Sequence, residues 1–358
     1  MEKNEALLKM EKVFSRKVQR DNKVQNAYLL VHSDKLNIHL KLAEGKSGLM
    51  DAHPDQPNYM ASVGKLFTST LAGILYEQGK IDFSDSIARF IDPELLHRLH
   101  VYKEKDYSKF ITISHLLNHT SGLGDNFWPL LNQVIENPDN PLSLRDAIAW
   151  AKTNSKPKFE PGKKFHYSDT NYHLLALIAE KATGMPFHEV LRQYIFTPLG
   201  MKHSWMLHHS VPAEDPELPV AEFYLRNTCL NNNRAYANID HAGGGVVAPM
   251  EDMLIFMKAL RTGKLLKKET LALMMNDTAR FALGIDYGYG IHQIKTVPLF
   301  MPAKYNCWGH MGATGSFLFF HPQTESFIMG SFNEGSWEKK AIRFMLFDII
   351  RNLVRVND

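Results

Sequence analysis

The sequence predicts an α/β protein of the α+β type, with one antiparallel sheet built from both ends of the chain. Strand-like runs lie near the N-terminus and again after about residue 285, whereas the region between is mostly helical, with loops rich in Pro, Asn and Gly. Amphipathic helical patterns occur near both termini. The economical arrangement is a sheet that is flanked by the terminal helices and interrupted by a helical insertion.

The individual elements follow from periodicity and from helix-ending glycines. Helices are predicted over residues 4–20, 62–79, 112–117, 143–151, 172–182, 250–260 and 338–354. Strands are predicted over residues 26–32, 36–42, 289–294, 315–320 and 326–332. The first two strands form a hairpin through Ser33-Asp34-Lys35, and the last two turn at His321-Pro322-Gln323-Thr324.

This order of elements predicts two domains. Residues 1–81 and 284–358 form a discontinuous sheet domain, and residues 82–283 form a mainly helical domain. Such a layout leaves a cleft between the two domains, which is a favoured place for a ligand site.

Composition indicates an ordinary globular protein and excludes several classes. Of 358 residues, 44% are hydrophobic and 22% are charged, and the net charge of +3 is too small to indicate a nucleic-acid partner. Only Cys229 and Cys307 occur, so no disulfide framework is implied, and two free thiols are the simpler interpretation. No signal-peptide pattern or membrane-spanning run is found, so a cytoplasmic protein is expected.

Ser62 and Lys65 stand three residues apart where an apolar helix begins. Positions three apart share a helix face, so the hydroxyl and the amine are expected within hydrogen-bonding reach. An amine in apolar surroundings loses part of its preference for the charged form. A neutral lysine can take the proton of a serine, so this pair is a candidate nucleophile and base.

A second candidate stretch is the Pro-Gly loop at residues 160–172, which runs directly into a strong helix. Tyr167 in this loop is a candidate proton shuttle, because a tyrosine near a lysine can be stabilised as phenolate. The structural alternative is that the Tyr167 ring merely packs, while Asp169 or Thr170 caps the helix.

The third stretch is glycine-rich and spans residues 307–317. Glycines at 309, 312 and 315 let the backbone approach a ligand closely, and N–H groups of an edge strand can form an oxyanion hole. His310 is a candidate hydrogen-bond donor to substrate. The alternative is a histidine that is simply tolerated in a strand.

These residues resemble the three motifs of the serine β-lactamase-related proteins, which in words are S-x-x-K, Y-x-N and K/H-x-G. The matching motifs, in order, are Ser62-Val63-Gly64-Lys65, Tyr167-Ser168-Asp169 and His310-Met311-Gly312. Further stretches resemble blocks of the same family, namely residues 115–123, 161–201 and 243–256. The resemblance covers nearly all of the chain from about residue 25. It is closest to the branch of class C β-lactamases, D-alanyl-D-alanine carboxypeptidases, D-aminopeptidases and β-lactamase-like esterases.

The resemblance implies a β-lactamase/penicillin-binding transpeptidase-like fold and a set of roles. Ser62 would be the acylated nucleophile, Lys65 its proton partner, and Tyr167 the general base and acid. The backbone N–H groups of Ser62 and Ala313 would form the oxyanion hole, with Gly312 beside the substrate. No metal or organic cofactor is implied.

Two positions depart from the family pattern. Asp169 replaces the asparagine of the second motif. Its carboxylate would either hold Lys65 in the charged form, which weakens that base, or face the substrate and select a cationic group. His310 stands where β-lactamases usually carry lysine, which resembles the peptidase and esterase members and weakens the fixed charge available for the carboxylate of a β-lactam.

Two other patterns are set aside. Residues 243–248 fit a dinucleotide fingerprint formally, but Pro249 follows and no β-α-β unit surrounds them. His115 and His119 lack an evident third ligand, so a metal site is not expected.

Three functional hypotheses remain. The preferred one is a serine hydrolase of small esters, amides or short peptides that acts through a Ser62 acyl-enzyme. The second is a β-lactamase or penicillin-sensitive D-Ala-D-Ala carboxypeptidase, and the third is a catalytically weak binding protein with the same fold. Oligomeric state and the physiological substrate are not indicated by the sequence.

Overall fold

The computed structural model describes residues 1–140 and 142–356. Its central element is a nine-stranded antiparallel sheet with the strand order β11-β12-β13-β14-β15-β16-β1-β2-β3. β1 lies beside β16 in this sheet, with Leu30 opposite Met329, so the predicted sheet from both ends of the chain is confirmed. The strands are β1 (Asn26–Ser33), β2 (Ile38–Ser47), β3 (Met50–Asp51), β11 (Ala279–Ala282), β12 (Ile285–Tyr287), β13 (His292–Ile294), β14 (Cys307–Gly312), β15 (Ser316–His321) and β16 (Ser326–Ser331).

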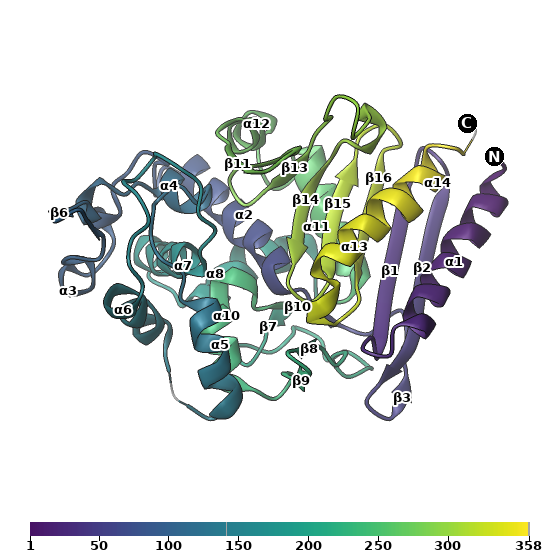
Figure 1. Cartoon of the computed structure of the whole chain (residues 1–358), viewed down its shortest axis with the longest axis horizontal. Coiled ribbons are helices and arrows are strands. Elements are labelled where there is room, and N and C mark those ends of the chain that lie inside the picture. The colour runs from purple at the N-terminus through teal and green to yellow at the C-terminus, as the bar shows by residue number, and fades with distance from the viewer. Residues whose placement is uncertain (141, 357–358) are drawn as a thin grey trace.

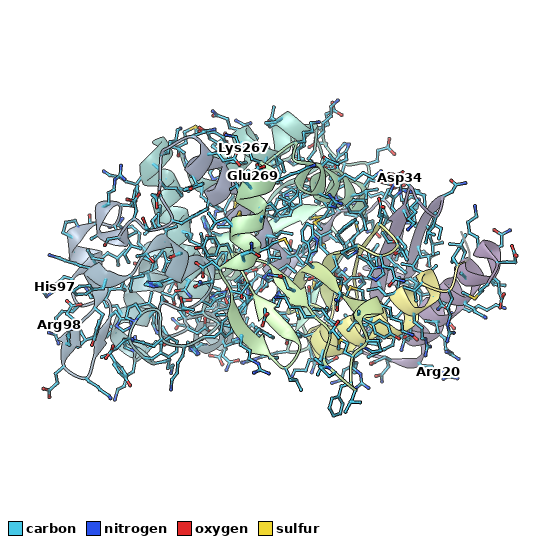
Figure 2. All side chains as sticks on the ribbon, turned by 90° about the horizontal axis from the view of Figure 1, so that it is seen from above. Arg20, Asp34, His97, Arg98, Lys267 and Glu269 are labelled. Carbon is cyan, nitrogen blue, oxygen red and sulfur yellow. The ribbon has the colours of Figure 1, made fainter. Side chains whose placement is uncertain are left out.

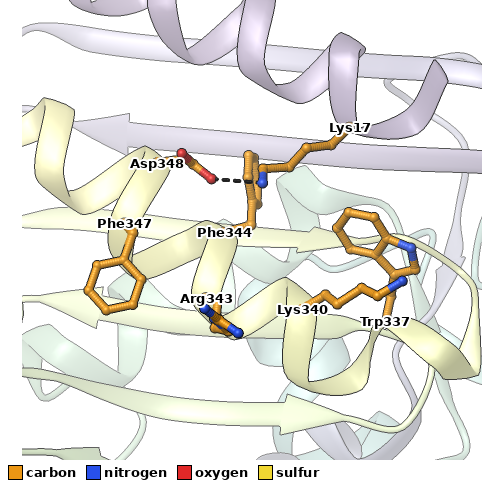
Figure 3. A pocket seen from close by; sticks show the side chains of 7 residues that line it. All are labelled: Lys17, Trp337, Lys340, Arg343, Phe344, Phe347 and Asp348. Carbon is orange, nitrogen blue, oxygen red and sulfur yellow. Dashed lines mark ion pairs between the residues drawn. The ribbon is translucent and has the colours of Figure 1, made fainter. Parts of the chain in front are cut away.

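The terminal helices lie side by side on one face of the sheet (Figure 1). They are α1 (Lys3–Arg20) and a continuous C-terminal helix made of α13 (Glu338–Phe344), the π-helical segment η7 (Met345–Ile350) and α14 (Arg351–Leu353). Phe14 packs against Phe344, with 6.1 Å between ring centroids. Figure 3 shows Lys17 and Asp348 joined as an ion pair of 3.1 Å between the two helices. The prediction that terminal helices flank the sheet is therefore confirmed.

The opposite face of the sheet is covered by α2 (Gly64–Glu77) and α11 (Met250–Thr262). Nearly every residue of α2 is buried, because this helix lies between the sheet and the helical part of the chain (Figure 1). Phe67 of α2 stacks on Phe256 of α11, with 3.8 Å between ring centroids. α2 thus carries its N-terminal end into the junction between the two parts of the molecule.

The remaining helices form the other half of the molecule, and Figure 2 shows His97 and Arg98 at its outer end, opposite Arg20. The helices are α3 (Pro93–Leu96), α4 (Ile113–Leu117), α5 (Phe127–Glu136), α6 (Leu144–Asn154), α7 (Asp169–Thr183), α8 (Phe187–Leu191), η4 (Arg192–Phe196), α9 (Thr197–Leu199), α10 (Arg234–Gly244) and α12 (Lys268–Asn276). Short 3₁₀ segments are η1 (Ala61–Val63), η2 (Ile87–Arg89), η3 (Ser108–Phe110), η5 (Ala303–Tyr305) and η6 (Gly335–Trp337).

Small sheets complete the fold. β10 (Val246–Ala248) lies between β4 (Asn58–Tyr59) and β7 (Trp205–Met206), and it fixes the segment that leads into Ser62. Two hairpins lie on loops, β5 (Val101–Tyr102) with β6 (Lys105–Asp106) and β8 (Tyr224–Leu225) with β9 (Thr228–Cys229). No helix among the described residues has the length and apolar character needed to cross a membrane.

Several predicted boundaries need correction. β2 starts at Ile38, because Asn37 adopts φ 50° and extends the turn. β13 is confined to 292–294, because Gly290 at φ 67° breaks the run before it. β14 was predicted to be an edge strand, but it is paired on both sides, by β13 and β15. Only its last residues, after Gly309, have no partner in β13 and are paired by β15 alone.

The helix over 172–182 begins three residues earlier, at Asp169. The strands β11 and β12 were not predicted, and β11 precedes the predicted domain boundary at 283/284 although it belongs to the large sheet. The division into two domains stays a prediction, and its residues 141, 357 and 358 lie outside the described part.

Candidate active site

Ser62 and Lys65 meet where η1 passes into α2. Ala61 adopts a left-handed conformation with φ 46°, so the chain turns sharply just before Ser62. Lys65 lies in the first turn of α2, and its Nζ lies 3.2 Å from the Ser62 Oγ. The hydrogen bond expected from the three-residue spacing is present.

The Lys65 amine is surrounded by acceptors and is closed off from solvent, with 0% of the residue exposed. Its Nζ donates to Asp169 Oδ1 at 2.5 Å, to the Gly243 carbonyl oxygen at 2.8 Å and to Ser62 Oγ. An ammonium group has three N–H donors, and here each one has an acceptor. The arrangement therefore fits a charged Lys65 that is paired with a buried carboxylate.

Backbone proximity makes this ion pair possible. A Cβ on Gly243 would lie 2.5 Å from Asp169 Oδ1 and 3.2 Å from Lys65 Nζ, so glycine is required at this position. Likewise a Cβ on Gly64 would lie 2.8 Å from the Gly244 Cα, because α2 and α10 touch through their backbones. The glycine block at 243–245 is thus a packing feature of the site.

The turn that delivers Gly243 is strained. His241, within α10, has φ 32° and ψ −116°, a conformation that side chains rarely adopt. Such strain persists only where the surrounding structure holds it, and it is often found at functional sites. Here it directs the Gly243 carbonyl toward Lys65.

Asp169 is the first residue of α7 and is itself held in place. Its backbone N–H donates to Asp125 Oδ1 at 2.9 Å. Burial and then the charge of Asp169 raise the pKa of Asp125 to about 6. The predicted alternative in which Asp169 contacts Lys65 is the one that the geometry supports, since its carboxylate is already occupied by an ammonium.

Tyr167 lies over the ion pair, half-buried, with Lys65 Nζ 5.1 Å from its ring centroid. Burial raises the pKa of Tyr167 well above its usual range, the negative charge of Asp169 adds to the rise, and a hydrogen bond with Ser62 opposes it. The phenol is therefore neutral in the resting site.

The end of β14 is fixed against the segment before Ser62. A Cβ on Gly312 would lie 2.8 Å from the Met60 carbonyl oxygen, and Ser316 Oγ donates to the same oxygen at 2.7 Å. This close approach brings Ala313 and Ser62 to the wall of one pocket. Gly312 was predicted to contact substrate, but it packs against Met60 and Ala61 and is not among the residues that line the pocket.

His310 is placed differently from the prediction. Its imidazole is 0% exposed, with Nε2 2.9 Å from the Tyr287 hydroxyl and Nδ1 2.7 Å from the Met311 carbonyl oxygen. Side chains alternate along a strand, and that of His310 faces the buried aromatic cluster, whereas its neighbour Met311 lines the pocket. No ring nitrogen of His310 is left for a substrate, so the predicted contact is not supported.

The pocket above Ser62 has a volume of about 200 Å³. Its lining residues are Ser62, Phe127, Trp128, Tyr167, Asp169, Phe281, His292, Met311, Ala313 and Glu338. The sequence analysis did not predict three of the aromatic lining residues, His292 or Glu338; the three are Phe127, Trp128 and Phe281. None belongs to a motif, and each reaches the pocket only through the pairing of strands or the docking of a helix.

The chain is similar to known proteins over most of its length. The profile described as beta-lactamase matches residues 15–345. A penicillin-binding protein of Bacillus subtilis is 32% identical over 148 residues, which cover 40% of this chain and 29% of that protein. The chain spans about a third of the length of this and two further curated relatives, at 36% and 33%.

Two solved structures share the fold over nearly the whole chain. A D-stereospecific amidohydrolase from Streptomyces sp. has a TM-score of 0.77 and 22% identity, covering 95% of this chain and 98% of that one. The hydrolase EstCE1, described as having promiscuous acyltransferase activity, has a TM-score of 0.75 and 21% identity, covering 98% of each chain. At such identity the likeness establishes the fold alone.

Proposed function

The chain belongs to the β-lactamase family, and on this premise we propose that it is a serine hydrolase that forms an acyl-enzyme on Ser62. The observation that carries the proposal is the hydrogen bond between Ser62 Oγ and a buried Lys65 that is itself paired with Asp169. A serine held by a buried amine in a pocket wall is the arrangement expected of an activated nucleophile.

In this proposal the proton of Ser62 leaves through Lys65. Lys65 first gives the proton that Nζ shares with Asp169 to the carboxylate, and the neutral amine then turns its lone pair toward Ser62 and takes the serine proton as Oγ bonds to the substrate carbonyl carbon. After this step Lys65 is again an ammonium and Asp169 is neutral. The buried ion pair therefore works as a relay, with Asp169 as the final acceptor.

Tyr167 completes the acylation step as the acid. Its phenol is neutral at the start, so it can donate a proton to the leaving oxygen or nitrogen as the bond to the carbonyl carbon breaks. Because the charge of Asp169 is one cause of the raised pKa of Tyr167, protonation of Asp169 in the first step makes the phenolate less costly. The two proton transfers are coupled through this charge.

Deacylation reverses both transfers. A water molecule attacks the acyl carbon and gives its proton to the Tyr167 phenolate. The Ser62 oxygen leaves and takes a proton from Lys65, which recovers one from Asp169. The oxyanion of each tetrahedral intermediate would be held by the N–H groups of Ser62 and Ala313, which lie in the same pocket wall.

The proposed substrates are small esters and amides, including short peptides. The pocket volume suits a small acyl group, and both an amidohydrolase and an esterase-type hydrolase share the fold. A β-lactamase is less well supported, because His310 is buried and hydrogen-bonded and so offers no group for the carboxylate of a β-lactam.

A covalent label tests the nucleophile. Wild-type protein treated with a fluorophosphonate should gain one adduct by intact mass spectrometry, and Ser62→Ala should gain none. Ser69→Ala, which removes a buried serine further along α2, is the matched control and should label like wild type. Equal labelling of Ser62→Ala would show that another residue is the nucleophile.

A further inference from the structure

The loop over residues 158–168, which carries Tyr167, lies against a second segment, residues 119–122. Backbone N–H groups of the loop donate to carbonyl oxygens of this segment. The bonds run from Lys158 to Gly122 at 2.8 Å, from Gly162 to Thr120 at 2.8 Å and from His166 to His119 at 2.9 Å. The segment belongs to the block at 115–123, to which the proposed mechanism gives no role.

His119 contacts the chain on both sides of Tyr167. Its carbonyl oxygen accepts from the His166 N–H at 2.9 Å, and its ring Nδ1 accepts from the Ser168 N–H at 3.3 Å. The imidazole also lies against the Tyr167 ring, with 4.2 Å between centroids and 32° between planes. One residue therefore holds the backbone before Tyr167, the backbone after it and the ring itself.

Neighbouring hydrogen bonds assign the proton of the His119 ring. The Ser121 hydroxyl oxygen accepts from the Leu123 N–H at 3.1 Å, and the hydroxyl donates to Asn171 Oδ1 at 2.6 Å. The amide of Asn171 is thereby oriented with Nδ2 toward His119 Nδ1, at 2.9 Å. Nδ1 thus accepts from the N–H groups of Ser168 and Asn171, so the ring proton is on Nε2.

These contacts require a neutral imidazole. A proton on Nδ1 would face two N–H donors, so protonation of His119 would break its bond to Ser168. The residue is 0% exposed. Burial, followed by the charge of Lys65, lowers the pKa of His119 well below its usual range. His119 is therefore a fixed acceptor at physiological pH.

We propose that His119 is a positioning residue for the acid of the reaction, and that it holds the Tyr167 phenol where the phenol can donate to the leaving atom. This inference rests on the proposed function, in which Tyr167 is that acid. His119 is not among the residues that line the pocket, so it acts only through Tyr167. A misplacement of about 1 Å at a reacting group can cost on the order of 100-fold in rate.

Two esters with the same acyl group test the proposal, methyl butyrate and p-nitrophenyl butyrate. Methoxide needs a proton to leave, whereas nitrophenolate does not, so only the methyl ester depends on a well-placed Tyr167. His119→Ala should lower kcat/KM about 100-fold for the methyl ester and less than about tenfold for the nitrophenyl ester. Equal losses for both esters would overturn the proposal.

His119→Asn should recover most of the methyl ester activity. The asparagine side chain offers an acceptor oxygen near the place of Nδ1, and asparagine tolerates the left-handed backbone of this position, where φ is 58°. A variant as slow as His119→Ala would show that the acceptor is not what positions Tyr167.

A double variant and a control complete the kinetic test. His119→Ala should cause little further loss for the methyl ester in the Tyr167→Phe background, because the group that it positions is already gone. An undiminished further loss would overturn the proposal. His321 is equally buried, and its ring nitrogens lie 2.7 Å from Thr324 Oγ1 and 2.9 Å from the Lys304 carbonyl oxygen. His321→Ala should therefore affect both esters alike.

Hydrogen exchange separates the positioning from the chemistry. Exchange of the Ser168 backbone amide, followed by mass spectrometry of peptides, reports the bond to His119 Nδ1 without any turnover. It should be at least about tenfold faster in His119→Ala and close to wild type in His119→Asn and His321→Ala. If wild type hydrolyses neither ester yet this exchange rises, the proposed function fails and the positioning role stands. If both esters are hydrolysed but exchange is unchanged in His119→Ala, the positioning role fails and the hydrolase stands.

Discussion

The Lys65 ammonium and the Asp169 carboxylate form an ion pair that lies almost wholly out of solvent, at the N-terminal ends of α2 and α7. Removing one partner of such a pair leaves a buried charge without compensation, which typically costs about 3–5 kcal/mol. The pair therefore holds α2 and α7 together, and in the proposed mechanism it also carries the proton that leaves Ser62.

Asp169→Asn should lower kcat by at least about 100-fold, because the relay loses its final acceptor. It should also destabilise the fold, as measured by urea unfolding. Asp125→Asn, which keeps an acceptor for the Asp169 N–H, is the control and should retain most activity. A faster Asp169→Asn enzyme would instead mean that Lys65 is the base and that Asp169 restrains it.

Tyr167→Phe should slow amides more than activated esters. An amine leaving group needs a proton, whereas nitrophenolate leaves without one. Loss of the Tyr167 acid should therefore lower the rate of amide hydrolysis more than the rate of ester hydrolysis. We expect a loss of about 100-fold or more for an anilide and a clearly smaller loss for a p-nitrophenyl ester. Equal losses for both would assign Tyr167 to the activation of Ser62 rather than to the leaving group.

Asp240 predicts a pH dependence of stability that is separate from catalysis. Burial raises the pKa of this carboxyl from 3.8 to about 8 in the folded protein. The folded state then holds its proton more tightly than the unfolded state, so stability is fully present below pH 3.8. It is lost as pH rises toward 8, by about 1.4 kcal/mol per pH unit from this group.

Asp240→Asn should remove that slope. The gain in unfolding free energy of the variant over wild type should therefore be larger at pH 8 than at pH 5. Urea unfolding of wild type and variant at the two pH values measures the effect. Asp139→Asn, an exposed aspartate, is the matched control and should leave the slope unchanged. A wild-type slope that persists in Asp240→Asn would place the titration on other groups.

Gly243→Ala should disrupt the ion pair directly, because its new methyl group would lie 2.5 Å from Asp169 Oδ1. We expect a loss of about 1–3 kcal/mol in unfolding free energy, as for other overpacked sites, together with a large loss of kcat. Gly79→Ala is the control, since a Cβ there meets nothing within 4 Å and only the strain of φ +67° is introduced. It should lose some stability but keep its activity.

The sequence predicted those parts of the site that depend on short spacing. The Ser62–Lys65 contact follows from helix geometry, and the position of Asp169 beside Lys65 follows from motif order and a helix start. The side-chain direction of His310 could not be predicted, because a one-residue shift in strand register turns each side chain to the other face. Nothing in the glycine-rich stretch specified that register.

Glu338 and His292 lay beyond prediction for a different reason. Their approach to Ser62 depends on contacts between segments more than 200 residues apart in sequence, and local periodicity holds no information about such contacts. A contact between distant segments also explains Gly243, because glycine is required there by a carboxylate on another helix. The resemblance of residues 243–256 to the family singled out this glycine, but it did not show that the glycine makes room for the Asp169 carboxylate.

The pairing of β1 with β16 has a consequence for how the protein is made. Residues 26–33 leave the ribosome some 300 residues before their partner strand at 326–331, and contacts so distant in sequence form slowly. Until then β1 has one unpaired edge, and such edges recruit strands of other chains. Nascent chains halted before residue 326 are therefore expected to aggregate or to need a chaperone, and truncation from the C-terminus should abolish yield before it affects the chemistry at Ser62.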